Sequence, residues 1–119
     1  MNHLNGCIIA ESLVDPTAIN RLKVYRAGIS SETQKIDDRG GIGRWHLYWV
    51  TCDRTQVDAI ERLLKRGWYA HFWRDQQITV VYADARFEIV ANDRSTWTDA
   101  VAHGRRHGIP EEQLDFLTA

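Results

Sequence analysis

The sequence contains few of the residues that mark specialised classes of protein. It has two cysteines and two prolines in 119 residues, which excludes a scaffold held together by several disulfide bridges. No apolar run approaches the roughly 20 residues of a transmembrane helix. The N-terminus also lacks the basic segment and apolar core of a secretory signal. We therefore expect a cytoplasmic protein with no membrane partner, in which Cys7 and Cys52 are buried, reduced thiols.

Charge of a single sign is also lacking. The 15 basic and 16 acidic residues give a net charge of −1, so no overall field attracts a nucleic-acid backbone or an anionic membrane. All basic residues except three lysines are arginines. Nucleic-acid binding would require Arg26, Arg44, Arg74 and Arg86 to gather on one surface, and we do not favour it.

The residues that are present indicate an ordinary globular protein. A hydrophobic share of 44% and a charged share of 26% are typical of a folded domain, and the length suits a single domain over residues 1–119. The most informative stretch is 67–90. Its β-branched and aromatic residues fall into three short runs, 68–73, 78–82 and 86–90, which are separated by polar turns. This pattern predicts a three-stranded meander.

Similar patterns predict three further strands, at 4–13, 23–34 and 44–52, with a bulge or bend at Gly28. Helical spacing predicts one helix that begins at the N-cap Thr55 and ends at Gly67, and a second from Ser95 or Thr96 to about His107. The fold class expected is α+β: a mostly antiparallel sheet of five to six strands with two main helices on one face, a ferredoxin-like variant. A split sheet or a partial barrel is the alternative.

Three segments carry a resemblance to known proteins. LNGCIIAESL near the start, GWYAHF at 67–72 and GIPEEQLDF at 108–116 resemble motifs of an uncharacterised family of small, single-domain bacterial and archaeal proteins. The resemblance covers nearly the whole chain and implies a single compact domain without implying an activity. An acidic residue often stands in that family where His71 stands here, so the resemblance argues against His71 as an obligatory catalytic group.

The candidate ligand-binding residues are His46, Tyr48, Tyr69, His71 and Trp73. Strand alternation places the first two on one side of their strand and the other three on one side of another strand. If these two sides coincide, they form an aromatic and imidazole surface that suits a pocket wall, a stacking platform or a subunit interface. The alternative is a second apolar layer, covered by the N-terminal segment or by a partner subunit.

Metal and cofactor binding are not expected. His103 and His107 lie four residues apart on a predicted helix, a spacing that can hold a metal ion. However, Arg105 and Arg106 stand between them and would repel a cation, and basic residues in a last helical turn are sufficiently explained by the helix dipole. The glycines of the segment 40–43 lack the pattern of a phosphate-binding loop and predict a flexible hairpin connection.

No catalytic signature can be named in this sequence. We therefore expect a binding protein, either a ligand-binding module or a protein-interaction module with a regulatory role. Apolar strand faces also suggest a homodimer. The alternative is a small enzyme that uses the five candidate residues, with the loop 40–43 as a lid. An enzyme predicts a concave pocket in which His46 or His71 contacts a carboxylate, whereas a binding role predicts a flat or covered face.

Overall fold

The computed structural model describes residues 3–31, 33–35 and 41–118. The strands are β1 (Leu4–Ile9), β2 (Lys23–Ile29), β3 (Gln34–Lys35), β4 (Ile42–Gly43), β5 (His46–Cys52), β6 (Tyr69–Arg74), β7 (Gln77–Tyr82) and β8 (Arg86–Val90). The α-helices are α1 (Arg54–Leu63) and α2 (Thr98–Arg106). Short 3₁₀ helices are η1 (Ala10–Ser12), η2 (Pro16–Arg21), η3 (Arg94–Trp97) and η4 (Glu111–Gln113).

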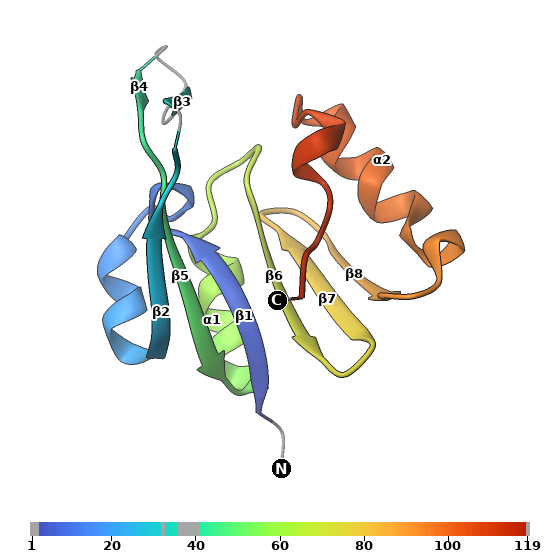
Figure 1. Ribbon diagram of the computed structural model, residues 1–119, viewed down its shortest axis with the longest axis horizontal. Coiled ribbons are helices and arrows are strands. Elements are labelled where there is room, and N and C mark those ends of the chain that lie inside the picture. The colour runs from blue at the N-terminus through green and yellow to red at the C-terminus, as the bar shows by residue number, and fades with distance from the viewer. Residues whose placement is uncertain (1–2, 32, 36–40, 119) are drawn as a thin grey trace.

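Six of the strands form one sheet in the order β2-β5-β1-β6-β7-β8, and every neighbouring pair is antiparallel (Figure 1). The predicted α+β class, the antiparallel sheet and the meander β6–β8 are thereby confirmed. The strands β3 and β4 pair separately and project beyond β2 and β5. Of the predicted hairpin loop 40–43, residues 42 and 43 form β4, and residue 40 lies outside the described residues.

The N-terminal strand β1 lies in the middle of the sheet. It pairs with β5 on one side and β6 on the other, so these two strands run parallel to each other. Helix α1 connects them, which makes a split β-α-β unit. The sheet therefore contains a parallel relationship between β5 and β6 although every direct pairing is antiparallel.

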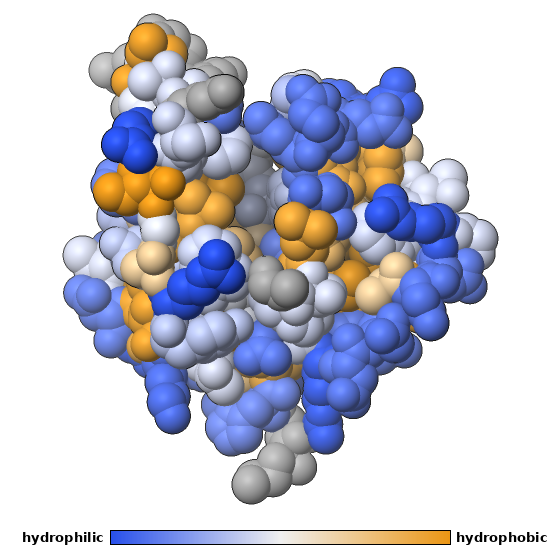
Figure 2. All heavy atoms as spheres, in the orientation of Figure 1, coloured by the Kyte–Doolittle hydropathy of each residue, from blue (hydrophilic) through white to orange (hydrophobic). Residues whose placement is uncertain are grey.

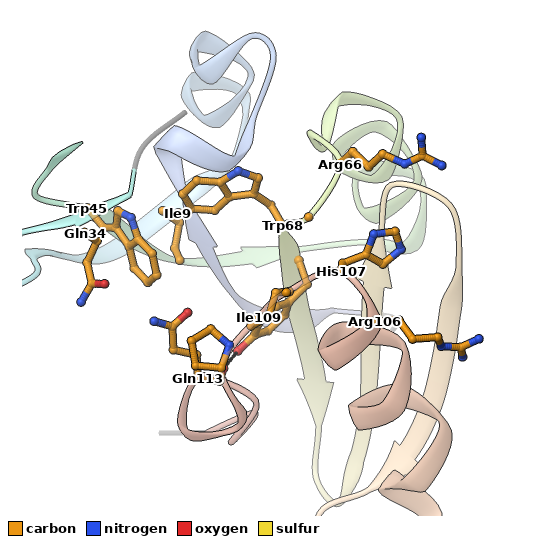
Figure 3. A pocket seen from close by; sticks show the side chains of 13 residues that line it. Ile9, Gln34, Trp45, Arg66, Trp68, Arg106, His107, Ile109 and Gln113 are labelled. Carbon is orange, nitrogen blue, oxygen red and sulfur yellow. Dashed lines mark hydrogen bonds between the residues drawn. The ribbon is translucent and has the colours of Figure 1, made fainter. Parts of the chain in front are cut away.

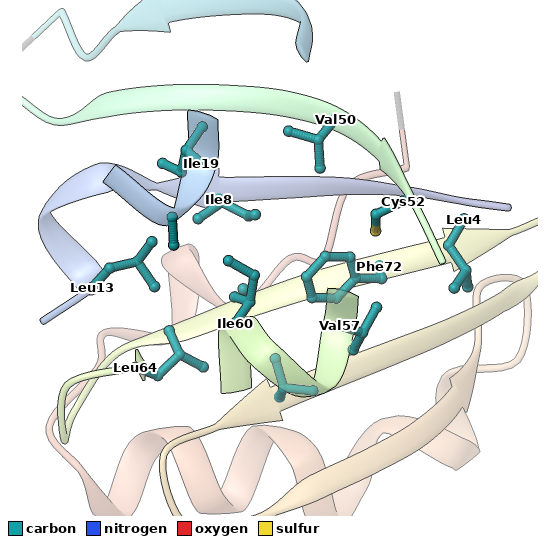
Figure 4. Close-up of a cluster of buried hydrophobic side chains, with 13 residues drawn as sticks. Leu4, Ile8, Leu13, Ile19, Val50, Cys52, Val57, Ile60, Leu64 and Phe72 are labelled. Carbon is teal, nitrogen blue, oxygen red and sulfur yellow. The ribbon is translucent and has the colours of Figure 1, made fainter. Parts of the chain in front are cut away.

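Helix α1 covers one face of the sheet. Its start is a capping box in which the Asp53 carboxylate accepts from the Gln56 backbone N–H at 2.9 Å, while the Gln56 side chain accepts from the Asp53 N–H. The predicted N-cap, Thr55, was wrong. A capping box prefers Glu or Gln three residues after the N-cap, and Gln56 stands there for Asp53, whereas Asp58 stands there for Thr55. Together with η2, this helix closes a mainly aliphatic core (Figure 4). Its fully buried members include Ile8, Leu13, Val50, Val57, Ile60 and Phe72.

Helix α2 packs on the opposite face. The core there is richer in aromatic side chains, and its buried members include Trp73, Tyr82, Trp97 and Phe116. The expectation of two helices on one face therefore holds only in part: α1 and the shorter η2 share one face, whereas α2 lies on the other. Gly104 permits the close packing of α2, since a Cβ atom there would lie 2.6 Å from Leu114 Cδ2 and 2.8 Å from Tyr82 Oη.

Two predicted strands are shorter than expected. The first ends at Ile9, because the chain turns into η1 and the Ser12 hydroxyl donates to the Ile9 carbonyl at 2.5 Å. The second strand ends at Ile29. The register of its pairing with β5 shifts between Val24 and Arg26, and not at Gly28 where a bulge or bend was predicted. A Cβ atom at Gly28 would lie 3.5 Å from the Trp49 ring, an ordinary van der Waals contact, so packing there does not require glycine.

Candidate functional site

The structure separates the five candidate residues into two groups on opposite faces of the sheet. Cys7 of β1 is the register partner of both Trp49 and His71, and directly opposed residues lie on the same face. Trp49 therefore shares the face of His71, and its neighbour Tyr48 points to the α1 side. The hypothesis that His46 and Tyr48 join Tyr69, His71 and Trp73 in one surface was wrong. Alternation assigns faces within a strand, but only register relates the faces of different strands.

The Tyr69, His71 and Trp73 face is covered by the C-terminal segment of the same chain. The Tyr69 hydroxyl donates to the Gln113 carbonyl, and His71 Nε2 donates to the Leu117 carbonyl at 2.6 Å. The Phe116 ring meets the Tyr69 ring edge-on, with centroids 5.3 Å apart. This face is thus a buried apolar layer, closed by residues 113–117 instead of the N-terminal segment or a partner subunit that we had considered.

Burial also sets the chemistry of these side chains. His71 is only 7% exposed, and the loss of hydration lowers its pKa from the usual 6.5. The same cause raises the pKa of Tyr69 above its usual value. Both groups therefore stay neutral at pH 7 and act as hydrogen-bond donors that hold the C-terminal segment.

His46 and Tyr48 lie at the other face, away from this layer. His46 is exposed, and the Glu11 carboxylate accepts from its backbone N–H at 2.8 Å and from Nδ1 at 2.7 Å. This is the histidine–carboxylate contact that an enzyme would use, but His46 does not line the cleft between Trp45, Trp68 and His107. Tyr48 borders a smaller hollow of about 370 Å³ beside η2.

A cleft of about 600 Å³ lies at the end of the sheet where β1 ends and β5 and β6 begin. Figure 2 shows the hollow between the lobe that carries β3 and β4 and the lobe that carries α2. Its apolar wall consists of Ile9, Trp45, Trp68, Tyr69, Ile109 and Pro110. Its polar lining consists of Gln34, Arg66, Arg106, His107 and Gln113, with Gly67 and Gly108 between them.

Two half-buried tryptophans dominate the apolar wall. Trp45 directly precedes β5 and Trp68 directly precedes β6, and their ring centroids lie 5.4 Å apart at an angle of 58° (Figure 3). Gly67 and Gly108, with φ of 86° and 82°, make the sharp turns that lead the chain out of the two helical segments. These left-handed conformations suit glycine, and they place Trp68 and Ile109 at the cleft.

The cationic end of the cleft lies at His107. Figure 3 shows His107 between Arg66 and Arg106, whose guanidinium groups extend on the side away from Trp45. Both arginines are exposed and His107 is half-buried. Among the residues that the structure describes, none of those lining the cleft is acidic. The cleft therefore combines an aromatic wall with a positively charged end.

Sequence reasoning found only Tyr69 of these lining residues. The strand pattern identified Trp45 and Trp68 as strand residues, but each lies just outside its strand and at the same end of the sheet. A signal was present: each helical segment is followed by a basic residue and a glycine, before Trp68 in one case and Ile109 in the other. Nothing in that signal showed that the two turns meet.

The arginines that nucleic-acid binding would require do not gather on one surface. Arg26 lies over the Trp49 ring at 4.3 Å, on the aromatic face. Arg86 pairs with Asp58 at 2.7 Å and Glu61 at 2.6 Å on α1, at the opposite face. The described arrangement thus lacks the cluster of Arg26, Arg44, Arg74 and Arg86 on which that hypothesis depends.

Both cysteines are free and face opposite sides of the sheet. Burial raises the pKa of the Cys7 thiol to about 11 and that of Cys52 to about 12. Because the thiolate is the nucleophile and the metal ligand, neither side chain is prepared for such chemistry at neutral pH.

Comparison with known proteins adds no relative: no family model, no curated protein and no solved structure matches the chain. Over residues 3–31, 33–35 and 41–118, no helix is long and apolar enough to cross a membrane. The class is thus defined by the fold and the site alone, as an α+β protein with a six-stranded antiparallel sheet and an aromatic, cationic cleft at one end.

Proposed function

We propose that the protein is a ligand-binding module whose site is the cleft, and that its ligand is a small planar organic anion. The observation that carries this proposal is the pairing of Trp45 and Trp68 with Arg66 and Arg106 around one cavity of about 600 Å³. Ligand sites usually have a volume of about 300–1,000 Å³, a mostly apolar lining and a few polar groups.

The aromatic wall favours a flat ligand. Trp45 and Trp68 are only half-buried, so each keeps part of a large apolar ring in contact with water. Covering that surface is favourable by about 25 cal/mol for each Å² removed from water. A planar group can also contact the face or edge of an indole ring, an arrangement that adds about 0.5–1.5 kcal/mol.

The polar lining favours an anionic group. Arg66 and Arg106 bring two positive charges, and an arginine can bind a carboxylate or a phosphate through two parallel hydrogen bonds. The amides of Gln34 and Gln113 supply donors and acceptors that orient a neutral part of the ligand. The alternative of a small enzyme has less support, because His46 contacts Glu11 outside the cleft and His71 is buried against a carbonyl.

A homodimer is part of the same proposal. Strand β2 forms one edge of the sheet, and it exposes Val24, Tyr25 and Ile29, with Tyr25 52% exposed. An exposed apolar edge strand is a template for pairing with a second chain. Free buried thiols agree with a reducing compartment, so we place the module in the cytoplasm.

A ferredoxin-like relationship also remains a proposal. It is supported by the split β-α-β unit of β5, α1 and β6 around β1. A ferredoxin-like fold contains a second unit of this kind. In the described chain, α2 follows the meander and leads into η4 and the covering segment.

The test is binding of anilinonaphthalene sulfonate, a planar aromatic anion, to the full chain, monitored by probe fluorescence. We expect saturable binding, and we expect Arg66→Ala and Arg106→Ala each to weaken it by about tenfold, because a charge-assisted hydrogen bond contributes about 1.5–3 kcal/mol. Arg62→Ala is the matched control, since Arg62 is exposed on α1 and does not line the cleft.

Native mass spectrometry of the protein purified from cells gives an independent result. A reproducible non-covalent mass that is lost under denaturing conditions would support the proposal and identify the ligand class, and the same spectrum reports the dimer. A bare chain, together with probe binding that is equal in all three arginine variants, would overturn it.

A further inference from the structure

Three side chains with metal-binding atoms meet beside the cleft. Asp84 lies in the turn between β7 and β8, and His103 and His107 lie one turn apart at the end of α2. Asp84 Oδ1 is 2.8 Å from His103 Nε2, and Oδ2 is 3.3 Å from His107 Nε2. One ligand atom from each of the three residues lies within 4.8 Å of the other two.

We propose that Asp84, His103 and His107 form a binding site for a divalent transition-metal ion, with zinc as the first candidate. Zinc binds imidazole nitrogen and carboxylate oxygen at about 2.0–2.2 Å in tetrahedral geometry. Ligand atoms on a tetrahedron of this size are about 3.3 Å apart, again from the same bond lengths. The His107–Asp84 distance of 3.3 Å equals that value, the His103–Asp84 distance of 2.8 Å is shorter, and no pair of the ligand atoms is more than 4.8 Å apart.

The surrounding structure positions His103 and the turn that carries Asp84. The imidazole of His103 lies against the rings of Tyr82 and Phe87, with centroids 4.6 Å and 5.4 Å away. The Tyr82 hydroxyl donates to the Ala100 carbonyl at 2.7 Å and so fixes α2 against β7. The Tyr82 backbone N–H donates to the Ala85 carbonyl at 2.8 Å and closes the turn that carries Asp84. A site with pre-positioned ligands loses little free energy to reorganisation when a metal binds.

The neighbouring arginines weaken the site without preventing it. Arg105 and Arg106 are both exposed, and charges in water interact by only about 1 kcal/mol at 4 Å. Within the described part of the chain, the Asp84 carboxylate pairs with the two histidines and with neither arginine. The carboxylate therefore remains available to offset the charge of a cation, which the helical spacing alone did not reveal.

The position of the site suggests its role. Three protein ligands leave a fourth position of a tetrahedral ion for water or a ligand atom. His107 belongs both to this cluster and to the lining of the cleft, so the ion would lie at the cationic end, where an anionic group of the ligand would reach it. This role rests on the proposed function of the cleft, whereas metal binding by the three residues does not.

The experiment is a calorimetric titration of the full chain, without a histidine tag and stripped with a chelator, using zinc ions alone. We expect saturable binding of a single ion per chain and a rise in melting temperature with zinc, because the folded state binds the metal better than the unfolded chain. Asp84→Asn and His107→Gln should each weaken binding by about 100-fold or more, since even the outer partners of metal ligands contribute about 10–100-fold. Cobalt substituted for zinc should show visible absorption bands that both variants lose.

His46→Gln is the matched control, because His46 also contacts a carboxylate, that of Glu11, at 2.7 Å but has no third ligand beside it among the described residues. It should leave zinc binding unchanged. Asp84→Asn preserves shape at a partly exposed position, so its circular dichroism spectrum should match that of the unchanged protein.

The proposal is overturned if zinc does not bind saturably, if binding survives both ligand variants, or if His46→Gln abolishes it. In the first case the three side chains are only a hydrogen-bonded contact between α2 and the β7–β8 turn. Arginine-dependent binding of the aromatic probe is measured without zinc, so failure of the metal site and failure of the cleft are distinguishable.

Discussion

The two faces of the sheet differ in both chemistry and closure. On the α1 face, the buried side chains are mainly aliphatic, such as Ile8, Val50 and Ile60, and a capped amphipathic helix covers them. On the other face, large aromatic side chains, some with polar tips such as Tyr82 and the partly buried Tyr69, pack among aliphatic ones. This face is covered by α2 and by an extended segment that is held through side-chain hydrogen bonds.

The difference between the two faces indicates that the α1 face mainly stabilises the fold, whereas the candidate binding sites lie at the edge of the other face. Aliphatic side chains can fill space at high density with no demand for polar partners, and a small hollow of about 370 Å³ lies beside η2. Aromatic side chains with hydroxyl, imidazole or indole groups need partners in defined directions. The edge of that aromatic layer is where the cleft and the histidine–aspartate cluster lie.

The largest effect should come from the α1 face. Phe72 is fully buried there, and its ring lies so close to β1 that a Cβ atom on Gly6 would be 2.4 Å from Phe72 Cδ1. Phe72→Ala should lower the free energy of unfolding by about 3–5 kcal/mol, through lost burial and the cavity left behind. Urea-induced unfolding measures this, and a loss below 1 kcal/mol would contradict the central place of this core.

A smaller effect should come from tighter packing at the aromatic face. Gly104→Ala should cost about 1–3 kcal/mol by overpacking, because the new methyl group would displace Leu114 and the hydrogen-bonded Tyr82. Ala102→Gly, at an exposed position of the same helix, is the control for helix propensity and should cost about 1 kcal/mol. Thermal unfolding of both variants checks this. A stabilised Gly104→Ala protein would show that propensity outweighs the contact.

The smallest effect should be a pH dependence that belongs to the aromatic face. Burial lowers the pKa of His71 in the folded chain below the usual 6.5. At pH values between the folded-state pKa and 6.5, the unfolded chain therefore binds more protons than the folded chain. The contribution of His71 is therefore fully present above pH 6.5 and is lost as the pH falls, with a slope of at most about 1.4 kcal/mol per pH unit.

Urea unfolding at several pH values between 5 and 8 tests this sign. His71→Gln keeps a donor for the Leu117 carbonyl but does not titrate in this range. It should flatten the acid slope, whereas Phe72→Ala should lower stability without changing that slope. An unchanged slope in His71→Gln would assign the pH dependence to other groups.

The elements were largely predictable, but their assembly was not. Val57 and Ile60 follow helical spacing, and the strand 86–90 was predicted with its exact bounds. Periodicity could not show that Cys7 aligns Trp49 with His71, because register depends on contacts between distant segments. This register places His46 and Tyr48 on the opposite face of the sheet from Tyr69, His71 and Trp73.

The candidate sites were missed for the same reason. The spacing of His103 and His107 was visible in the sequence, but the third ligand, Asp84, comes from a turn 19 residues before His103. Likewise Trp45 and Trp68 precede different strands and meet because β5 and β6, on either side of β1, both begin at the end of the sheet where β1 ends. Neither meeting follows from a local pattern.

The central place of β1 also bears on how the chain reaches its folded state. Leu4 pairs with Cys52, and Gly6 pairs with Phe72, so both pairings of β1 join residues that lie far apart in the sequence. Contacts between such distant residues slow folding, and an unpaired apolar strand is open to association with other chains while it waits. The middle of the sheet therefore depends on long-range pairing, whereas β6, β7 and β8 are joined by short turns.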